Sequence, residues 1–368
     1  MSATDFGTAN FNSSNVDLAT ADPRDVICAI AASANEYNGQ LGARISALFV
    51  IMAVSTCATF FPVIAKRVPR LHVPLYVYLF ARYFGAGVIV ATAFIHLLDP
   101  AYGEIGPNTC VGMTGGWAQY SWCPAIVLTS VMMIFLLDFG AERFVEIKYN
   151  VRTEQDIQAA VTGVEDGNEP NGPHGIPTTD TSPAKNDYEK GFSEEIEFGD
   201  TEAGRLAFKQ QIAAFLILEF GVIFHSVIIG LNLGVVGSEF STLYAVLVFH
   251  QSFEGLGIGA RMSAIPFKPG VWLPWILCSA YGLTTPIAIA IGLGLRTTYN
   301  PNSFTANVVS GVLDSMSAGI LIYTGLVELL ARDFLFNPLR TRDGKRLAFM
   351  MGTTFLGAGI MALLGKWA

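Results

Sequence analysis

The chain is short of charged side chains. Lysine, arginine, aspartate and glutamate make up only 14 % of its 368 residues, against about 25 % in an average soluble domain. The segment 140–205 holds 21 of these charges, so the rest of the chain is poorer still and cannot cover the surface of a water-soluble globule. A nucleic-acid-binding protein is also excluded, because no basic face exists that could neutralise phosphates.

Long apolar stretches take the place of the missing charges. Hydrophobic residues make up 52 % of the sequence, and its mean hydropathy is +0.45. Eight stretches are long enough to cross about 30 Å of hydrocarbon as helices. They lie near residues 45–65, 75–99, 124–141, 212–236, 240–260, 271–295, 304–330 and 347–365. The expected fold class is therefore all-α: a polytopic membrane protein with eight transmembrane helices.

Lysine and arginine are unevenly divided between the two sides of this arrangement. The loops after the first, third, fifth and seventh stretches carry 17 of them, and the opposite side carries four. The positive-inside rule then places both termini outside the cytosol. The predicted regions are an extracellular N-terminal tail without a cleavable signal peptide (1–40), helices 1–3 (41–149), an acidic cytosolic loop (150–205) and helices 4–8 (206–368).

The acidic loop 150–205 is rich in Asp, Glu, Gly, Pro, Thr and Asn and has few apolar runs. Such a segment cannot bury enough surface to offset the entropy lost on ordering, so we expect it to be disordered. Two interpretations stay open. It is either a solvated connector or a regulatory tail, in which ubiquitination enzymes would act on Lys185 and Lys190.

The five cysteines do not have the spacing of a metal cluster. Cys57 and Cys278 lie within predicted spans, where a thiol is usually a small apolar filler. Cys110 and Cys123 share the second outside loop. Facing an oxidising compartment, they could form a disulfide, with two free thiols as the alternative. Cys28 is then left unpaired.

Ionisable side chains inside a membrane span cost about 2.5–3.5 kcal/mol each on insertion scales, so each needs a reason. Two adjacent predicted helices concentrate them. FHSVIIGLNLG contributes His225, and FHQSFEGLGIGAR contributes His250 and Glu254, four residues apart on one helical face. The full set is Arg82, His96, Asp138, Glu219, His225, His250, Glu254, Asp314 and Glu328, with Asp99 at the outer edge of the second span.

Two histidines and a carboxylate form a typical ligand set for borderline divalent ions such as Zn²⁺ and Fe²⁺. Three protein ligands leave room for water or a passing group, and a transport site must release its ion as well as bind it. A buried hydrogen-bonded network that fixes helix packing is the alternative reading. The metal interpretation is favoured, because the residues lie on neighbouring helices.

HSVIIGLNLG followed by HQSFEGLGIGAR resembles the fourth- and fifth-helix signatures of the ZIP family of divalent-metal transporters, in the branch of the fungal zinc permeases and the plant iron and zinc transporters. The resemblance covers about residues 40–368. It implies a 3+2+3 helix bundle with two inverted three-helix repeats. It also implies uptake of Zn²⁺, and of Fe²⁺ as a second candidate, across the plasma membrane into the cytosol.

Carried over by position, the resemblance makes His225, His250 and Glu254 the primary metal ligands. Ser226 and Gln251 occupy the adjacent motif positions, where other members have further ligands. Two residues of the second helix complete the candidate site. They are His96, which matches a helix-two histidine of this branch, and Asp99, which together with Glu104 lies where related sequences have acids that influence selectivity.

Three departures from the family pattern refine this expectation. Members with a two-metal site have acids where this chain has Ile229 and Thr285. An aliphatic side chain cannot bridge two cations, so we expect one main metal ion. The long loop of other members usually carries a run of histidines, whereas this loop has His174 alone, which argues against a zinc sensor in the loop.

The other intramembrane charges are less informative. Asp138 and Glu328 could face Arg82 or lie near the membrane interfaces, and a structural role is favoured for both. Asp314 lies deeper in the seventh span. It is either a proton or second-metal contact or a packing residue.

Motifs of other functional classes are absent from the sequence. It has no HExxH or GxGD motif, no GxxxxGK[ST] nucleotide site and no lysine within a predicted span. We therefore expect a transporter driven by a gradient, of the metal alone or coupled to protons, and not an enzyme. An intramembrane zinc-dependent hydrolase or a receptor is the alternative. No cofactor is expected, and the candidate partners are the Zn²⁺ substrate, the lipid bilayer and a second copy of the chain in a homodimer.

Overall fold

A computed structural model describes residues 21–31, 37–68, 74–149, 202–268, 270–336 and 341–367, and none of these residues lies in a β-strand. The chain divides into two compact units. The first comprises Met1–Phe135 and Ala214–Ala368 and contains every residue of the candidate site, and the second is Leu136–Ala213. The expected disorder of the acidic loop concerns residues 150–205, of which 150–201 lie outside the described residues.

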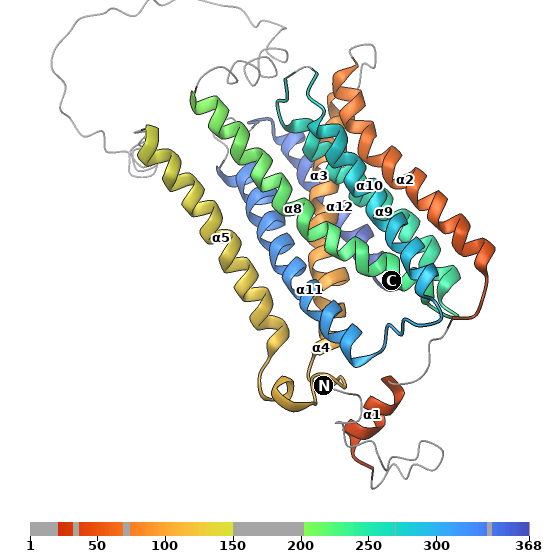
Figure 1. Cartoon of the computed structure of the whole chain (residues 1–368). Helices are drawn as coiled ribbons and strands as arrows, with labels where there is room; N and C mark the ends of the chain where they lie inside the picture. Colours follow the sequence, from red (N-terminus) through yellow and green to blue (C-terminus); the bar gives the residue numbers. More distant parts are fainter. Residues whose placement is uncertain are drawn as a thin grey trace, which may run out of the picture. The chain divides into compact units, whose positions relative to one another are not determined.

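The helices follow the predicted apolar stretches (Figure 1). In chain order they are α1 (Pro23–Ala31), α2 (Leu41–Arg67), α3 (Leu75–Ala91), η2 (Thr92–Leu98), α4 (Asp99–Ile105), η3 (Gly115–Gln119), α5 (Trp122–Tyr149), α8 (Glu202–Val235), α9 (Phe240–Ala264), α10 (Leu273–Leu295), α11 (Phe304–Tyr323), η4 (Thr324–Phe336) and α12 (Gly344–Leu364). η2 and η4 are π-helices, and η3 is a 3₁₀-helix. Helix α1 lies in the N-terminal tail, where the sequence predicts no helix.

Six helices in the described part of the chain are long and apolar enough to cross a membrane. They are Leu41–Arg67, Leu75–Ile105, Trp122–Ala141, Gln211–Val235, Leu273–Leu295 and Gly344–Leu364. The other two predicted spans, 240–260 and 304–330, are helical as α9 and as α11 with η4. They are not among the six, and they carry polar side chains of the candidate site, including His250, Glu254 and Asp314. The all-helical prediction is confirmed, and six spans are consistent with a polytopic membrane protein.

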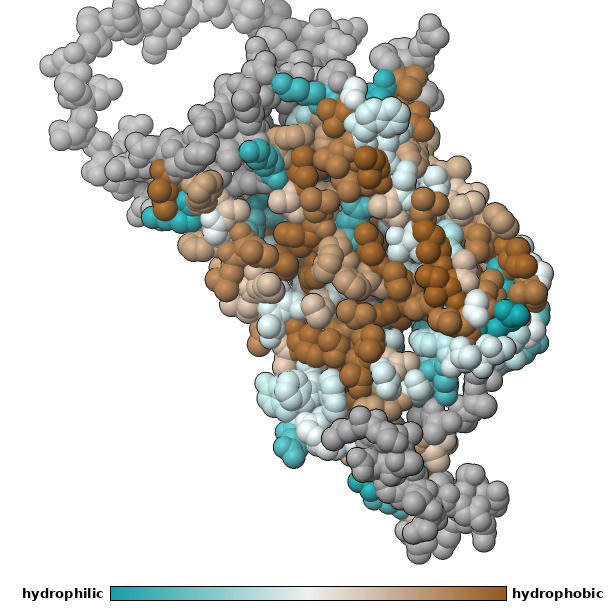
Figure 2. Space-filling view, in the orientation of Figure 1, coloured by the Kyte–Doolittle hydropathy of each residue, from teal (hydrophilic) through white to brown (hydrophobic). Residues whose placement is uncertain are grey.

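Large apolar side chains remain exposed along these helices. Figure 2 shows hydrophobic residues over much of the visible face. Phe49 of α2 is 57 % exposed, Leu128 of α5 62 % and Phe355 of α12 70 %. A soluble monomer rarely exposes apolar patches on this scale, so these side chains are suited to contact lipid.

Glycines allow α3 to pack directly against two other helices. A Cβ atom added to Gly85 of α3 would collide with the backbone of Gly257 of α9. One added to Gly357 of α12 would collide with the backbone of Phe84 of α3. Such contacts between small residues are the usual means of close helix packing in membranes. They hold η2, which continues α3, beside the middle of α9.

Ion pairs connect α3 with the end of the seventh predicted span. Arg82 pairs with Asp333 of η4, with 2.8 Å between Nη2 and Oδ2. Glu328 pairs with Arg332 at 3.0 Å and with Arg261 at 3.7 Å. The sequence reading ended the seventh span at residue 330 and so left Asp333 out of it. Asp138 belongs to the second unit.

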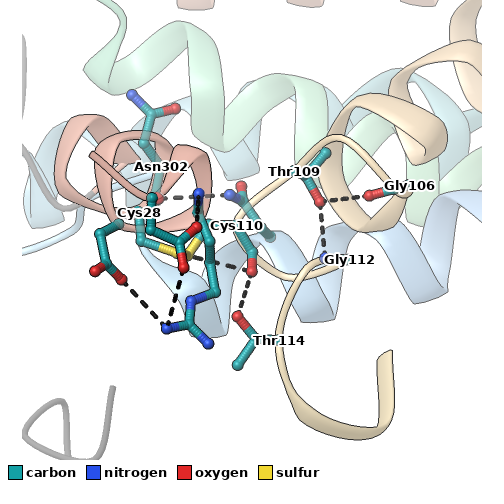
Figure 3. The surroundings of a disulfide bond; sticks show 11 residues. Cys28, Gly106, Thr109, Cys110, Gly112, Thr114 and Asn302 are labelled. Atoms are coloured by element: carbon teal, nitrogen blue, oxygen red, sulfur yellow. Dashed lines mark hydrogen bonds and ion pairs between the residues drawn. A yellow bond between two sulfur atoms is a disulfide. The ribbon is translucent and has the colours of Figure 1, made fainter. Parts of the chain in front are cut away.

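The disulfide joins Cys28 to Cys110 (Figure 3). Cys123 is a free thiol. The expected pairing of Cys110 with Cys123 is therefore wrong. Cys123 lies at the start of α5 and is buried in a cluster with Ala101, Ile105 and Val111, where it cannot face Cys110. Helix α1 supplies the partner, and no pattern in the sequence indicates that the N-terminal tail folds back onto the loop after α4.

This pairing predicts the peptide map of the unreduced protein. Digestion should release one cross-linked peptide that joins Cys28 to Cys110, because their sulfurs are bonded. Cys123 should react with a maleimide only after denaturation, because it is 1 % exposed. The Cys28→Ser variant is the control and should make Cys110 reactive. A peptide that joins Cys110 to Cys123 would contradict the structure.

Candidate metal site

Helices α8 and α9 bring the three predicted primary ligands together. The ring of His225 on α8 and the ring of His250 on α9 have centroids 5.5 Å apart. Glu254 lies one turn after His250, with 3.7 Å between its Oε2 and the Nε2 of His250. All three residues are buried, at 3 % exposure or less. The predicted grouping of these residues therefore exists in the fold.

His96 reaches the same group from η2. Its ring centroid lies 4.7 Å from that of His250, and the two rings are nearly perpendicular. The Nε2 atom of His96 lies 3.1 Å from the carbonyl oxygen of Met361 on α12. A carbonyl can only accept, so Nε2 carries the proton and Nδ1 keeps its lone pair. The π-helical turn places this ring against α9, and such turns often occur at functional sites.

Polar atoms without hydrogen-bond partners gather around these residues. They are Nε2 of His225, Oγ of Ser226, both ring nitrogens of His250, both amide atoms of Gln251, Oε1 of Glu254, Oγ1 of Thr285 and Oδ1 of Asp314. Buried polar atoms are nearly always paired, so a concentration of unpaired ones requires an explanation. In the described residues, no three His, Cys, Asp or Glu side chains lie close enough to hold a metal ion as they stand.

The remaining candidates from the sequence divide into two groups. Ser226 and Gln251 are fully buried next to the histidines. Asp99 is exposed at the first position of α4 and lies outside the buried group. Glu104, on the same short helix, has one carboxylate oxygen that is buried and unpaired. The two acids therefore differ, because Asp99 is exposed and Glu104 presents a buried oxygen.

The two departures from the family pattern have different surroundings. Ile229 packs against an apolar cluster that includes Leu233 and Ile289, so its position offers no ligand. Thr285 is fully buried, and its hydroxyl has no hydrogen-bond partner. A neutral hydroxyl is a weak ligand, so neither position supplies the negative charge that a second cation would need.

Comparison with known proteins identifies the family. The model of the ZIP zinc transporter family matches residues 41–365. The chain belongs to this family. It is 57 % identical over 373 residues to "Zinc-regulated transporter 1" of Saccharomyces cerevisiae, with 96 % of each chain covered. It is 41 % identical to "Zinc-regulated transporter 1" of Schizosaccharomyces pombe, which covers 91 % of this chain and 88 % of that protein.

More distant relatives of this ZIP protein include "Zinc transporter 9" of Oryza sativa, 32 % identical over 339 residues, with 88 % of this chain and 89 % of that protein covered. No solved structure gives a significant match. The protein is therefore a zinc transporter and not an enzyme. The hydrolase alternative is not favoured.

Tyr281 of α10 is a neighbour of the ZIP site that sequence reasoning missed. Its hydroxyl lies 3.3 Å from Oε2 of Glu254 and 3.1 Å from the carbonyl oxygen of Gln251. Donation to the carboxylate would hold one oxygen of Glu254 and leave Oε1 free. The sequence offered one indication of this contact. Tyr281 lies five residues before Pro286, which kinks the predicted span, and polar side chains near such a kink can reach a neighbouring site.

Asp314 of α11 is the second residue outside α8 and α9 that approaches the candidate ligands, and it does so at His225. Its Oδ1 lies 4.0 Å from Nδ1 of His225. A carboxylate on this side favours the tautomer with the proton on Nδ1, which leaves the unpaired Nε2 of His225 available for a metal. The sequence left open a proton or second-metal contact and a packing role for Asp314, and the geometry adds a third, orientation of the His225 ring.

We expect Asp314→Asn to weaken zinc binding by about 10-fold to 100-fold, the usual cost of removing the carboxylate behind a metal-bound histidine. The amide keeps the volume of the side chain but no longer favours one tautomer of His225. Equilibrium zinc titration of the purified protein measures the change. An unchanged affinity would mean that Asp314 only packs.

Proposed function

We propose that this ZIP protein moves Zn²⁺ into the cytosol through a site formed by His225, His250 and Glu254, with His96 as a further contact. The observation that carries the proposal is the group of buried, unpaired nitrogen and oxygen atoms between η2, α8 and α9. A divalent cation would satisfy them together. No hydrogen-bonded network among the same side chains does so.

The spacing of the imidazoles supports a shared ion. Two imidazoles bound to one tetrahedral Zn²⁺ through bonds of about 2.0–2.1 Å have ring centroids about 5 Å apart. The centroid distances from His250 are 4.7 Å to His96 and 5.5 Å to His225. The backbone therefore already holds the rings at the right separation, and small side-chain rotations would turn their lone pairs toward one ion.

The ligand set is better suited to an ion that is bound and released during transport than to an ion that stays bound. Neutral imidazoles and one carboxylate compensate for the lost hydration of Zn²⁺, yet they do not close a four-ligand cage around it. Ser226 and Gln251 are neutral oxygen donors that can be exchanged as the ion moves. Because Ile229 offers no ligand, we propose one main metal ion. Fe²⁺ accepts the same ligands and is the second candidate substrate.

The topology is part of the same proposal. Eight transmembrane helices in a 3+2+3 bundle with inverted repeats would place α8 and α9 at the centre. The distribution of Lys and Arg supports both termini outside the cytosol, and hence Asp99 on the outer side. We further propose a plasma-membrane location, a homodimer, and ubiquitination at Lys185 and Lys190, which lie outside the described residues.

Zinc uptake by liposomes that contain the purified protein tests the function. We expect saturable uptake down a zinc gradient without any nucleotide, since the sequence has no nucleotide site. Protein-free liposomes are the control. Uptake equal to that of the empty vesicles, from protein that elutes as a folded species, would contradict the proposal.

A further inference from the structure

Glu219 of α8 is a buried carboxylate that the site described above does not use. It is 2 % exposed, and its Oε1 has no hydrogen-bond partner. No lysine, arginine or histidine in the described part of the chain forms an ion pair with it. An unpaired carboxylate within a membrane span is costly, and its presence indicates a function.

The direction of the helices shows on which side of the site Glu219 lies. Gly255 and Gly259 of α9 pack beside Ser55 and Pro62 of α2, in that order, so α2 and α9 run in the same direction.

Helix α10 runs opposite to α2. Gly282 lies against Thr56, whereas Trp275, earlier in α10, stacks on Phe60, later in α2. The rings of Trp275 and Phe60 have centroids 5.6 Å apart. Helix α10 is therefore also antiparallel to α9.

Helix α8 is parallel to α10, because Gly230 approaches Ala288 and, one turn later in both helices, Gly234 approaches Gly292. It is therefore antiparallel to α9. At 1.5 Å per residue, Glu219 lies about 9 Å before His225 along its helix axis. That displacement is toward the end of the bundle at which α9 ends.

Glu254 is displaced toward the same end, because it follows His250 on α9 by four residues, or about 6 Å. The two carboxylates therefore lie on the same side of the histidines, with Glu219 further along. This is the end that we propose faces the cytosol.

The packing of α8 against α10 places Cys278 of α10 at the level of Glu219. Gly230 of α8 faces Ala288 and Ile289 of α10. Glu219 lies eleven residues before Gly230 on α8. Because the two helices run in parallel, its counterparts on α10 lie eleven residues before Ala288 and Ile289, at residues 277 and 278. Cys278 is fully buried on that turn. Tyr281, one turn further along α10, contacts Glu254. A line of polar groups thus runs from Glu254 past Tyr281 to Cys278 and Glu219.

We propose that Glu219 and Cys278 form a second, transient site for a divalent metal ion, which receives the ion after it leaves the site of His225, His250 and Glu254. A carboxylate oxygen and a cysteine sulfur are both ligands of Zn²⁺. Two protein donors hold an ion weakly, and a relay site must do so if the ion is to move on. The proposal rests on the proposed transport function and extends it by one step.

Replacement of Glu219 tests the relay, because the rate of zinc uptake and the zinc affinity of the main site can be measured separately. In liposomes, Glu219→Gln should lower the maximal zinc uptake rate at least tenfold, because the amide keeps the shape but loses the charge. Equilibrium zinc affinity at the main site should stay within twofold of wild type. Glu219→Asp should keep at least a third of the rate. Wild-type uptake by Glu219→Gln, or lost zinc affinity at the main site, would overturn the relay.

Cadmium detects the second site directly. In a His250→Ala background, which disables the main site, added Cd²⁺ should give the ultraviolet charge-transfer band of a cadmium–thiolate bond. A further Cys278→Ser change should abolish the band and Glu219→Gln should weaken it. Cys57→Ser is the control, since this exposed span cysteine should not contribute. An unchanged band in the Cys278→Ser protein would overturn the proposal.

The failure of the relay is distinguishable from the failure of the proposed function. If the relay alone is wrong, His250→Ala still loses uptake, while Glu219→Gln transports normally. If the proposed main site is wrong, His250→Ala itself retains wild-type uptake. The cadmium band does not depend on transport and decides whether Cys278 and Glu219 bind a metal.

Discussion

His250→Ala is expected to reduce zinc uptake to the background of empty vesicles. His250 is the centre of the site: its ring lies 4.7 Å from that of His96 and 5.5 Å from that of His225, and Glu254 is 3.7 Å away. Removing it would delete one of the three proposed primary ligands and the ring that lies between the others. The ion would then lose its hydration without adequate replacement in the interior of the bilayer.

Uptake per molecule at the membrane measures this effect, so the amount of protein at the surface must be determined alongside the rate. Phe249→Leu is a matched control. It precedes His250 on α9 and is 55 % exposed, and its replacement should leave uptake near wild type. Glu254→Ala should behave as His250→Ala does, and His225→Ala nearly so. Normal uptake by the His250→Ala variant would contradict the proposal that His225, His250 and Glu254 form the transport site.

Arg44→Met is expected to destabilise the fold by several kcal/mol. Arg44 of α2 is fully buried. It donates hydrogen bonds to the carbonyl oxygens of Leu233 at 2.9 Å and Gly234 at 3.3 Å, and to that of Val236. Leu233 and Gly234 lie in the last turn of α8, the helix that carries His225, and Val236 directly follows that helix. Each hydrogen bond to a charged group contributes about 1.5–3 kcal/mol, and its loss leaves a buried acceptor unpaired.

Thermal unfolding in detergent measures the loss for Arg44. Arg44→Lys should be intermediate, because a single ammonium group cannot reach all the carbonyls that the guanidinium fork reaches. Arg24→Ala is the control, since the side chain of Arg24 on α1 is 46 % exposed and exposed ion pairs contribute little. An Arg44→Met protein with wild-type stability would show that the end of α8 is held by other contacts.

Much of the fold was predictable from the sequence. The apolar stretches fixed where the helices lie, because only long apolar helices can satisfy the backbone in a membrane. The pairing of His250 with Glu254 followed from helical spacing alone. The approach of His225 to His250 was inferred from their place on consecutive predicted helices and then from the family resemblance, since spacing within one helix gives no information about which helices are neighbours.

Other features depended on contacts between distant segments. The π-helical turn that carries His96 packs mainly against α11, a helix distant in the sequence, and leaves no periodic signal. Helix α1 was missed because its nine residues, PRDVICAIA, are a short apolar run within an otherwise polar tail. The bond from Cys28 to Cys110 was missed with it. Asp314 faces His225 only because α11 packs beside α8, and no pattern within either helix reports that contact.

Diffraction at the zinc absorption edge, from crystals of the protein grown with zinc, tests the central claim most directly. The account predicts one dominant anomalous peak in contact with His225, His250 and Glu254, and no peak of similar strength beside Ile229. Two equally strong peaks there, or a dominant peak away from His250, would contradict it.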